Sequence, residues 1–191
     1  MIRRWFAINS FWILSVIFGF SGFSFQNDPR EKITRQYFAH LNASQIEQAK
    51  VLTDTAFIFE NFEGRKKSRT TYFEEFQRKL ELHPITEIIE CIIHENYLEV
   101  WGSNSSDYNI YLDFDALPIK YNVSFKNGKI QHIYFDSLPG YGEKRKALQI
   151  KTLEFQHWIE RNHPEYAAEY QRNGYMKEAP KLLKEYTRQK K

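Results

Sequence analysis

The fold is decided by three stretches near the start of the domain: Thr34-Arg-Gln-Tyr-Phe-Ala-His-Leu-Asn42, Leu52-Thr-Asp-Thr-Ala-Phe-Ile-Phe-Glu60 and Tyr72-Phe-Glu-Glu-Phe76. The first and third place apolar side chains at helical spacing, and the second has the bulky composition of a strand. A capping box at Ser44-Gln-Ile-Glu47 predicts a short helix between the first two stretches. The domain therefore opens with two helices, a strand that ends on a carboxylate, and a third helix.

The chain then changes to the two-residue period of β-strands. A long run with strand composition ends at a polar loop, residues 102–107. Apolar and polar residues alternate over 108–114 and again over 119–125, which predicts two half-buried strands. Asn127-Gly128 predicts a type I′ hairpin turn into a returning strand. A run of helices followed by a run of strands indicates α+β architecture.

The two ends of the chain stand apart from this domain, which spans residues 28–142. Residues 1–24 have the pattern of a signal peptide, with a basic start, an apolar segment and small residues after it. The mature domain is then exported, either periplasmic or secreted. The alternative is an uncleaved membrane anchor over residues 5–25, and only in that case does the sequence predict membrane contact. Residues 143–191 return to helical periodicity, as a C-terminal extension that packs on the domain or binds a partner.

Composition excludes several classes of function. The net charge of +3 over 191 residues is too small to favour nucleic acid as a partner. The single cysteine, Cys91, lies in an apolar run and is interpreted as a buried structural thiol. Neither a metal-ligand spacing of His and Cys nor a glycine-rich phosphate loop occurs, so no metal and no cofactor are predicted.

Residues 30–141 resemble the nuclear transport factor 2-like superfamily, which includes ketosteroid isomerase-like and SnoaL-like proteins. The resemblance rests on the first two stretches quoted above and on Phe125-Lys-Asn-Gly-Lys-Ile-Gln-His-Ile-Tyr-Phe-Asp136. It implies a cone-shaped α+β barrel, in which three N-terminal helices lie against a curved, mostly antiparallel sheet that encloses a pocket. It also implies that the outer sheet face can form a homodimer.

The resemblance supplies a candidate catalytic pair, Tyr37 and Glu60. In ketosteroid isomerases a tyrosine on the first helix donates a hydrogen bond to the substrate oxyanion, and a carboxylate at the end of the first strand moves the proton. Tyr37 and Glu60 stand at the matching positions. Tyr121 or Asn122 replaces the protonated Asp that the family carries on a late strand, and the base is Glu rather than Asp. Both departures argue against steroid isomerisation.

A pocket beside this pair would be lined by aromatic and polar side chains. A carboxylate desolvated by such walls can act as a general base, and a phenol opposite it can stabilise an enolate. The alternative is structural: Tyr37 as a core residue, Glu60 as a solvated strand end, and the two strand histidines as satisfied residues. The pocket candidates are Phe38, Phe57, His94, Trp101, Tyr111, Asn122 and His132.

Two functions remain open from the sequence. The first is an exported domain that binds a small apolar ligand or a protein partner, including a second copy through the sheet face. The alternative is a cofactor-independent isomerase, cyclase or hydratase that uses Glu60 as general base and Tyr37 as oxyanion donor. Convergence of Tyr37, Glu60 and Asn122 on one pocket would favour the enzyme, whereas aromatic side chains filling the cone would favour the binding protein.

Overall fold

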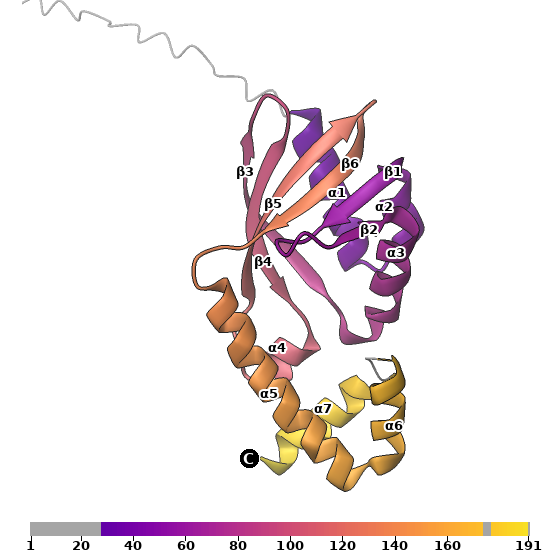
Figure 1. The fold of residues 1–191 in the computed structure, drawn as a ribbon, viewed down its shortest axis with the longest axis vertical. Coiled ribbons are helices and arrows are strands. Elements are labelled where there is room, and N and C mark those ends of the chain that lie inside the picture. Colours follow the sequence, from indigo (N-terminus) through magenta and orange to yellow (C-terminus); the bar gives the residue numbers. More distant parts are fainter. Residues whose placement is uncertain (1–27, 174–176, 191) are drawn as a thin grey trace, which may run out of the picture.

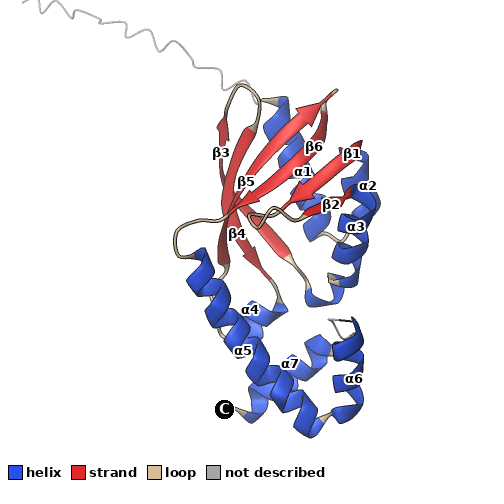
Figure 2. Ribbon diagram, in the orientation of Figure 1, coloured by secondary structure: helices blue, strands red, loops and turns tan. Residues whose placement is uncertain are grey.

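The computed structural model describes residues 28–173 and 177–190. Three N-terminal helices pack against a curved six-stranded sheet, and four further helices lie at one end of it (Figures 1 and 2). The strands are β1 (Thr53–Glu60), β2 (Lys66–Ser68), β3 (Ile85–Ile93), β4 (Leu98–Ser105), β5 (Leu117–Lys126) and β6 (Lys129–Asp136). The helices are α1 (Pro29–Asn42), α2 (Ile46–Val51), α3 (Arg69–Arg78), α4 (Asp107–Tyr111), α5 (Tyr141–Asn162), α6 (Pro164–Asn173) and α7 (Ala179–Gln189), with a short 3₁₀ turn η1 (Leu80–Leu82).

The sheet has the strand order β2-β1-β6-β5-β4-β3. The β1–β6 pair is parallel and the other pairs are antiparallel. The predicted α+β class, with helices against a curved and mostly antiparallel sheet, is confirmed. The sheet is not closed into a barrel, because β2 and β3 remain as its two edges.

Local sequence signals explain where several elements begin and turn. The Asp28 side chain accepts a hydrogen bond from the Arg30 backbone and caps α1, whose first residue is a proline. Asn127 and Gly128 adopt φ values of 53° and 72° between β5 and β6, as the predicted type I′ turn requires. Both strands of this hairpin lie where the alternation predicts them.

The predicted capping box at Ser44 is wrong. Ser44 has a φ of 60°, in the left-handed region, and α2 begins two residues later at Ile46. The Gln45 backbone N–H donates to the carbonyl of His40 at 2.8 Å, and the His40 ring contacts the Gln45 side chain at 2.7 Å. Ser44 therefore serves the tight turn out of α1, and α2 has no side-chain cap.

The predicted loop and strand over residues 102–114 are also wrong. β4 continues to Ser105, and α4 follows where alternation predicts a strand. The reason is a capping box at the start of α4. The Asn109 side chain accepts a hydrogen bond from the Ser106 backbone N–H, and the Ser106 side chain accepts one from the Asn109 backbone N–H. This local hydrogen bonding outweighs the two-residue period of the apolar side chains.

Two separate hydrophobic cores result. The larger one lies between α1–α3 and the inner face of the sheet and includes fully buried Tyr37, Phe57 and Phe73. The smaller one joins α5 and α7 to α4, around Phe155 and Leu182. The extension predicted from residue 143 thus starts at Tyr141 and forms a helical unit with its own core rather than a layer over the sheet (Figure 1).

The described part of the chain contains no helix that is both long and apolar enough to span a bilayer. The predicted signal peptide, residues 1–24, and the alternative anchor, residues 5–25, lie outside the described residues.

Candidate functional site

Aromatic rings fill the space between the helices and the sheet. Tyr37 on α1 packs edge-on against Phe38, with ring centroids 5.1 Å apart. Phe38 stacks on Tyr121 of β5 at 5.3 Å, and Tyr121 contacts Phe135 of β6 at 5.6 Å. Phe57 of β1 meets Phe73 of α3 at 6.1 Å in the same core. The interior expected to hold a ligand is thus occupied by the protein's own side chains along these contacts.

The Tyr37 hydroxyl is buried and makes no regular hydrogen bond within the described residues. Burial raises the pKa of Tyr37 well above its ordinary value, and the nearby phenols of Tyr72 and Tyr121 raise it further. Burial also raises the pKa of Tyr72, to about 12. Tyr37 is therefore a neutral phenol at physiological pH and keeps the proton that an oxyanion donor needs.

Glu60 lies on the opposite face of the sheet. Phe57 and Phe59 point into the core, so the alternation along β1 turns Ile58 and Glu60 outward. The Glu60 carboxylate lies 3.2 Å from Nε2 of His132 and 3.5 Å from Nζ of Lys66. The structure does not bring Tyr37 and Glu60 together, because a sheet separates the two side chains.

The expected pocket residues are divided among three places. Phe38 and Phe57 lie in the inner core with Tyr37. Tyr111 belongs to α4 and lines a pocket of the helical unit. The other four candidates lie on the outer sheet face. Trp101, Asn122 and His132 alternate with buried core residues along their strands. His94 follows the end of β3, beside Glu99.

Strand register arranges the outer face into a polar row. Glu60, Tyr134, Asn122 and Glu99 are paired in succession across β1, β6, β5 and β4. The Trp101 indole donates to Glu99 Oε1 at 2.6 Å. Carboxylates therefore stand beside cationic or aromatic groups across the whole face.

A second ion pair lies next to this row. Lys120 Nζ is 2.7 Å from Asp136 Oδ2 and 5.7 Å from the centre of the Trp101 ring. The hydrogen bond from Lys120 to Asp136 raises the pKa of Lys120 above its ordinary value. The lysine is therefore charged and contacts both the carboxylate and the indole.

Three buried polar atoms on this face have no hydrogen-bond partner of regular geometry within the described residues: His94 Nε2, Asn122 Oδ1 and His132 Nε2. A buried polar group left unpaired costs about 1–3 kcal/mol. The nearest carboxylates are 3.9 Å from His94 and 3.2 Å from His132. All three residues were expected from the sequence as pocket candidates, but the sequence does not show that they share one face.

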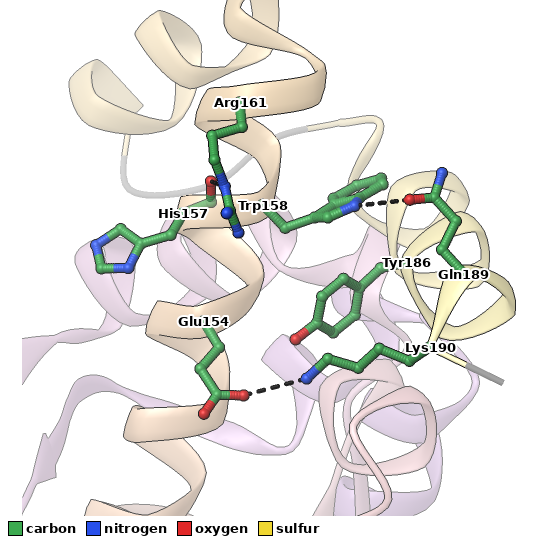
Figure 3. Close-up of a pocket in the computed structure, with 7 residues that line it drawn as sticks. All are labelled: Glu154, His157, Trp158, Arg161, Tyr186, Gln189 and Lys190. Carbon is green, nitrogen blue, oxygen red and sulfur yellow. Dashed lines mark hydrogen bonds and ion pairs between the residues drawn. The ribbon is translucent and has the colours of Figure 1, made fainter.

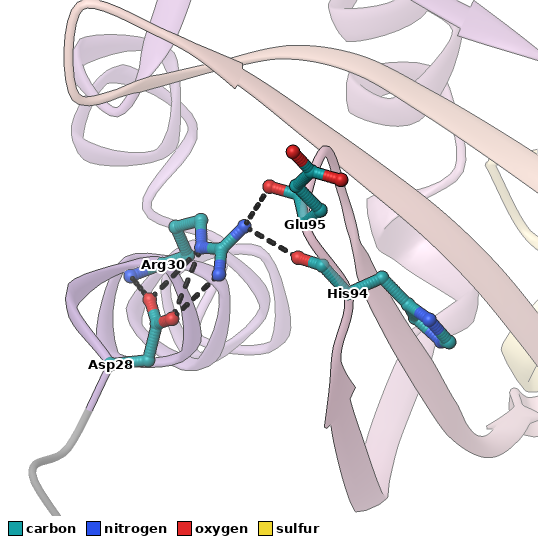
Figure 4. A network of polar contacts seen from close by, with 4 residues as sticks. All are labelled: Asp28, Arg30, His94 and Glu95. Carbon is teal, nitrogen blue, oxygen red and sulfur yellow. Dashed lines mark hydrogen bonds and ion pairs between the residues drawn. The ribbon is translucent and has the colours of Figure 1, made fainter.

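One end of the outer face is anchored to α1 (Figure 4). Arg30 donates to the backbone carbonyls of His94 at 2.9 Å and Glu95 at 3.3 Å. The same guanidinium forms an ion pair with Asp28 at 2.8 Å. The hydrogen bond from Arg30 holds the pKa of Asp28 below its ordinary value. This network fixes the β3–β4 turn, and with it the backbone of His94, against the start of α1.

Two adjoining pockets lie in the C-terminal helical unit. The larger, of about 390 Å³, is between α5 and α7 (Figure 3). The smaller, of about 330 Å³, lies beside it and includes Tyr111. The larger pocket was not expected from the sequence, because its walls come from helices whose mutual packing the sequence does not specify. The larger pocket is lined by Glu154, His157, Trp158, Arg161, Tyr186, Gln189 and Lys190.

Within the described residues, no cluster of three or more His, Cys, Asp or Glu side chains is placed to hold a metal ion. Cys91, expected to be buried, is half-buried, and burial raises the pKa of its thiol. That direction makes the thiol less reactive near neutral pH.

No protein-family model matches the chain, and no curated protein matches it in sequence. Solved structures do match it. Bal32a, from a soil-derived mobile gene cassette, is 13% identical with a TM-score of 0.50, covering 61% of this chain and 95% of Bal32a.

Two further solved structures also resemble part of the chain. An NTF2-like protein of unknown function from Cytophaga hutchinsonii is 13% identical, with a TM-score of 0.46 over 56% of this chain and 89% of its own. A protein with a ketosteroid isomerase-like fold from Catenulispora acidiphila, solved with trimethylamine, is 8% identical, with a TM-score of 0.45 over 56% and 85%. At these identities the likeness concerns the fold alone.

Proposed function

We propose that the chain is an exported binding domain without catalytic activity, and that its partner is a second copy docked on the outer sheet face. The observation that carries the proposal is the separation of Tyr37 from Glu60 by the sheet. A general base and an oxyanion donor must reach one substrate together. The rings that pack between the helices and the sheet also argue against a small apolar ligand there.

The outer face has the composition of an interface. Ile58 and Ile92 are 38% and 39% exposed on it, and Trp101 and Tyr134 add aromatic surface. Aromatic side chains are enriched in protein interfaces, and a specific interface buries about 1,200–2,000 Å² in total.

Charge favours a second copy as the occupant. Carboxylates and cationic groups both occur on the face, in the pairs Glu60–Lys66 and Asp136–Lys120. In a two-fold dimer the same patch meets itself, so acidic groups of one copy can face basic groups of the other. A face of a single charge sign would repel its own copy. In Figure 1 the C-terminal helices lie beyond one end of the sheet and leave the face of its central strands open.

The test is the mass of the full chain in solution, measured by analytical ultracentrifugation. We expect a dimer for the wild type and a monomer for Ile58→Lys, which places a charge on an apolar part of the proposed interface. Val51→Lys is the matched control, because Val51 is 66% exposed on α2, away from the outer face; it should remain dimeric. A monomeric wild type, or equal dissociation of both variants, would contradict the proposal.

Native mass spectrometry of the same preparation tests the two rival functions. We expect no retained small molecule. A retained apolar compound whose binding is lost in Tyr37→Phe would instead favour a ligand or substrate inside the cone. Mass analysis of the chain from its own cells also tests export: cleavage after Ser24 gives a mature start at Phe25, whereas an anchor leaves the N-terminus intact.

A further inference from the structure

The pocket between α5 and α7 is independent of the sheet face and has its own chemistry. Glu154, His157, Trp158 and Arg161 stand at positions i, i+3, i+4 and i+7, so they occupy one side of α5. Gln189 and Lys190 approach from the end of α7. In Figure 3, His157 and Arg161 lie on one side of the pocket, with Gln189 and Lys190 on the other.

Two aromatic rings form the floor of the pocket. Trp158 and Tyr186 are buried, with 7% and 5% exposed, and their centroids are 5.5 Å apart at an interplanar angle of 60°. The Trp158 indole N–H is already used, because it donates to the Gln189 side chain at 3.0 Å. Lys190 Nζ lies 4.6 Å from the centre of the Tyr186 ring and covers part of it, so Trp158 is the ring left to contact a flat apolar group.

The charged side chain at the rim that has no ion-pair partner is a cation. Glu154 pairs with Lys190 at 3.2 Å, which neutralises the one carboxylate of the lining. The Nε of Arg161 donates a hydrogen bond to the His157 carbonyl at 3.2 Å, and the two terminal nitrogens of its guanidinium have no partner within the described residues. The His157 ring has none there either and is exposed. A planar guanidinium with free terminal nitrogens matches a carboxylate or phosphate in bidentate geometry.

The surrounding charge has the same sign. Residues 141–191 carry 12 Lys and Arg against 7 Asp and Glu, a net charge of +5. The whole chain carries only +3, so the excess is concentrated in the helical unit. Such a field raises the local concentration of anions and lowers that of cations. Pockets of a few hundred cubic ångströms suit small organic molecules.

We propose that the α5–α7 pocket binds an organic anion in which a carboxylate is joined to an aromatic ring. The ring lies against Trp158, beside the lysine that covers Tyr186, and the carboxylate meets the terminal nitrogens of Arg161. The same chemistry occurs in a free aromatic acid and at the C-terminus of a peptide that ends in an aromatic residue. The site lies at the far end of the molecule from the start of α1 (Figure 1).

The test uses the full chain and NMR, following the indole N–H of Trp158, which Trp158→Phe identifies by its disappearance. The probes are N-acetylphenylalanine, its neutral amide, and a pentapeptide ending in phenylalanine with a free carboxylate. We expect the acid to move the Trp158 signal with saturation, and the amide to bind at least about tenfold more weakly, since a charged hydrogen bond is lost. Binding of the acid but not of the peptide identifies the ligand as a free aromatic acid. Tighter binding of the peptide identifies it as the C-terminus of a polypeptide.

Arg161→Ala should weaken the acid about tenfold, and Arg161→Lys should recover only part of the loss, because an ammonium cannot bind in bidentate geometry. Arg188→Ala is the matched control: it removes the same charge from α7 at an exposed position outside the pocket. An unmoved Trp158 signal at saturating acid, equal binding of acid and amide, or equal losses in Arg161→Ala and Arg188→Ala would each overturn the proposal.

Discussion

On β5, Ile119, Tyr121 and Val123 point towards the helices and are buried, whereas Lys120 and Asn122 between them point to the outer face and are half-buried. The inner face is closed by rings and aliphatic side chains of its own chain. The outer face carries ion pairs, aromatic groups and polar atoms without partners. The same strands thus serve stability on one side and, in the proposed dimer, recognition on the other, so substitutions on the two sides should differ in kind.

The largest expected effect is on the inner face. Phe57→Ala should lower the free energy of unfolding by about 3–5 kcal/mol, because the fully buried ring leaves a cavity between β1 and α3. Urea unfolding of the full chain measures the change. The control is the adjacent residue on the other face: Ile58→Ala should cost under about 1 kcal/mol, since the side chain is already part-exposed. Equal losses would show that the two faces do not differ.

Gly102→Ala tests how closely β4 approaches its neighbour. A Cβ at Gly102 would lie 1.9 Å from the carbonyl oxygen of Glu87, next to the irregular register between β3 and β4. The strands must separate, so we expect a loss of about 1–3 kcal/mol in unfolding free energy. Gly142→Ala is the control, because nothing lies within 4 Å of its Cβ position in α5. A near-neutral Gly102→Ala would contradict the close approach.

Arg30→Ala should release the β3–β4 turn from α1 and cost about 1–2 kcal/mol, from the loss of charge-assisted hydrogen bonds. The pKa of Asp28 should then rise to its ordinary value in an NMR titration. Because the native pKa is lowered, the contribution of the ion pair is present above the unfolded value of about 3.9 and is lost as pH falls through the native pKa.

Arg30→Ala should therefore lose the fall in stability at low pH that protonation of Asp28 causes in the wild type. Arg35→Ala is the matched control, since its pair with Glu31 is a surface i,i+4 contact of the same helix and should be worth about 0.3–0.5 kcal/mol. If Arg30→Ala costs no more than Arg35→Ala, the network in Figure 4 does not hold the turn.

The smallest expected effect has the opposite sign. Tyr37→Phe removes a buried hydroxyl that lacks a regular partner, so stability should stay unchanged or rise by up to about 1 kcal/mol. Tyr121→Phe, the comparison, removes the acceptor of the Asn104 side chain at 3.0 Å and should destabilise by a similar amount. Thermal unfolding of both variants distinguishes them; a larger loss in Tyr37→Phe would mean that its hydroxyl has a partner.

Much of the fold follows from local patterns in the sequence. The Asn127-Gly128 turn and the alternation before it predict the β5–β6 hairpin, because both signals are local and agree. Residues 108–114 show where this fails: their alternation is real, but the Ser106–Asn109 cap makes a helix. A two-residue period on its own does not outweigh hydrogen bonds between backbone and side chain.

The candidate site was less predictable, for a geometric reason. Moving one residue along a strand changes the face on which a side chain lies. Glu60 does lie at the end of β1 as predicted, but its position in the strand alternation turns its side chain to the outer face, beside His132 and away from Tyr37. The α5–α7 pocket was out of reach for another reason, since Trp158 and Lys190 meet only through packing of distant helices.

The place of β1 in the sheet has a consequence for how the chain folds. β1 ends at residue 60, yet its inner neighbour is β6, which ends at residue 136. During synthesis, at about 5–20 residues per second, the first strand waits several seconds for its parallel partner. Contacts between such distant segments slow folding, because the intervening loop must close first. The first three helices thus emerge from the ribosome with their apolar sides uncovered, and this interval is when the nascent chain is most open to chaperones.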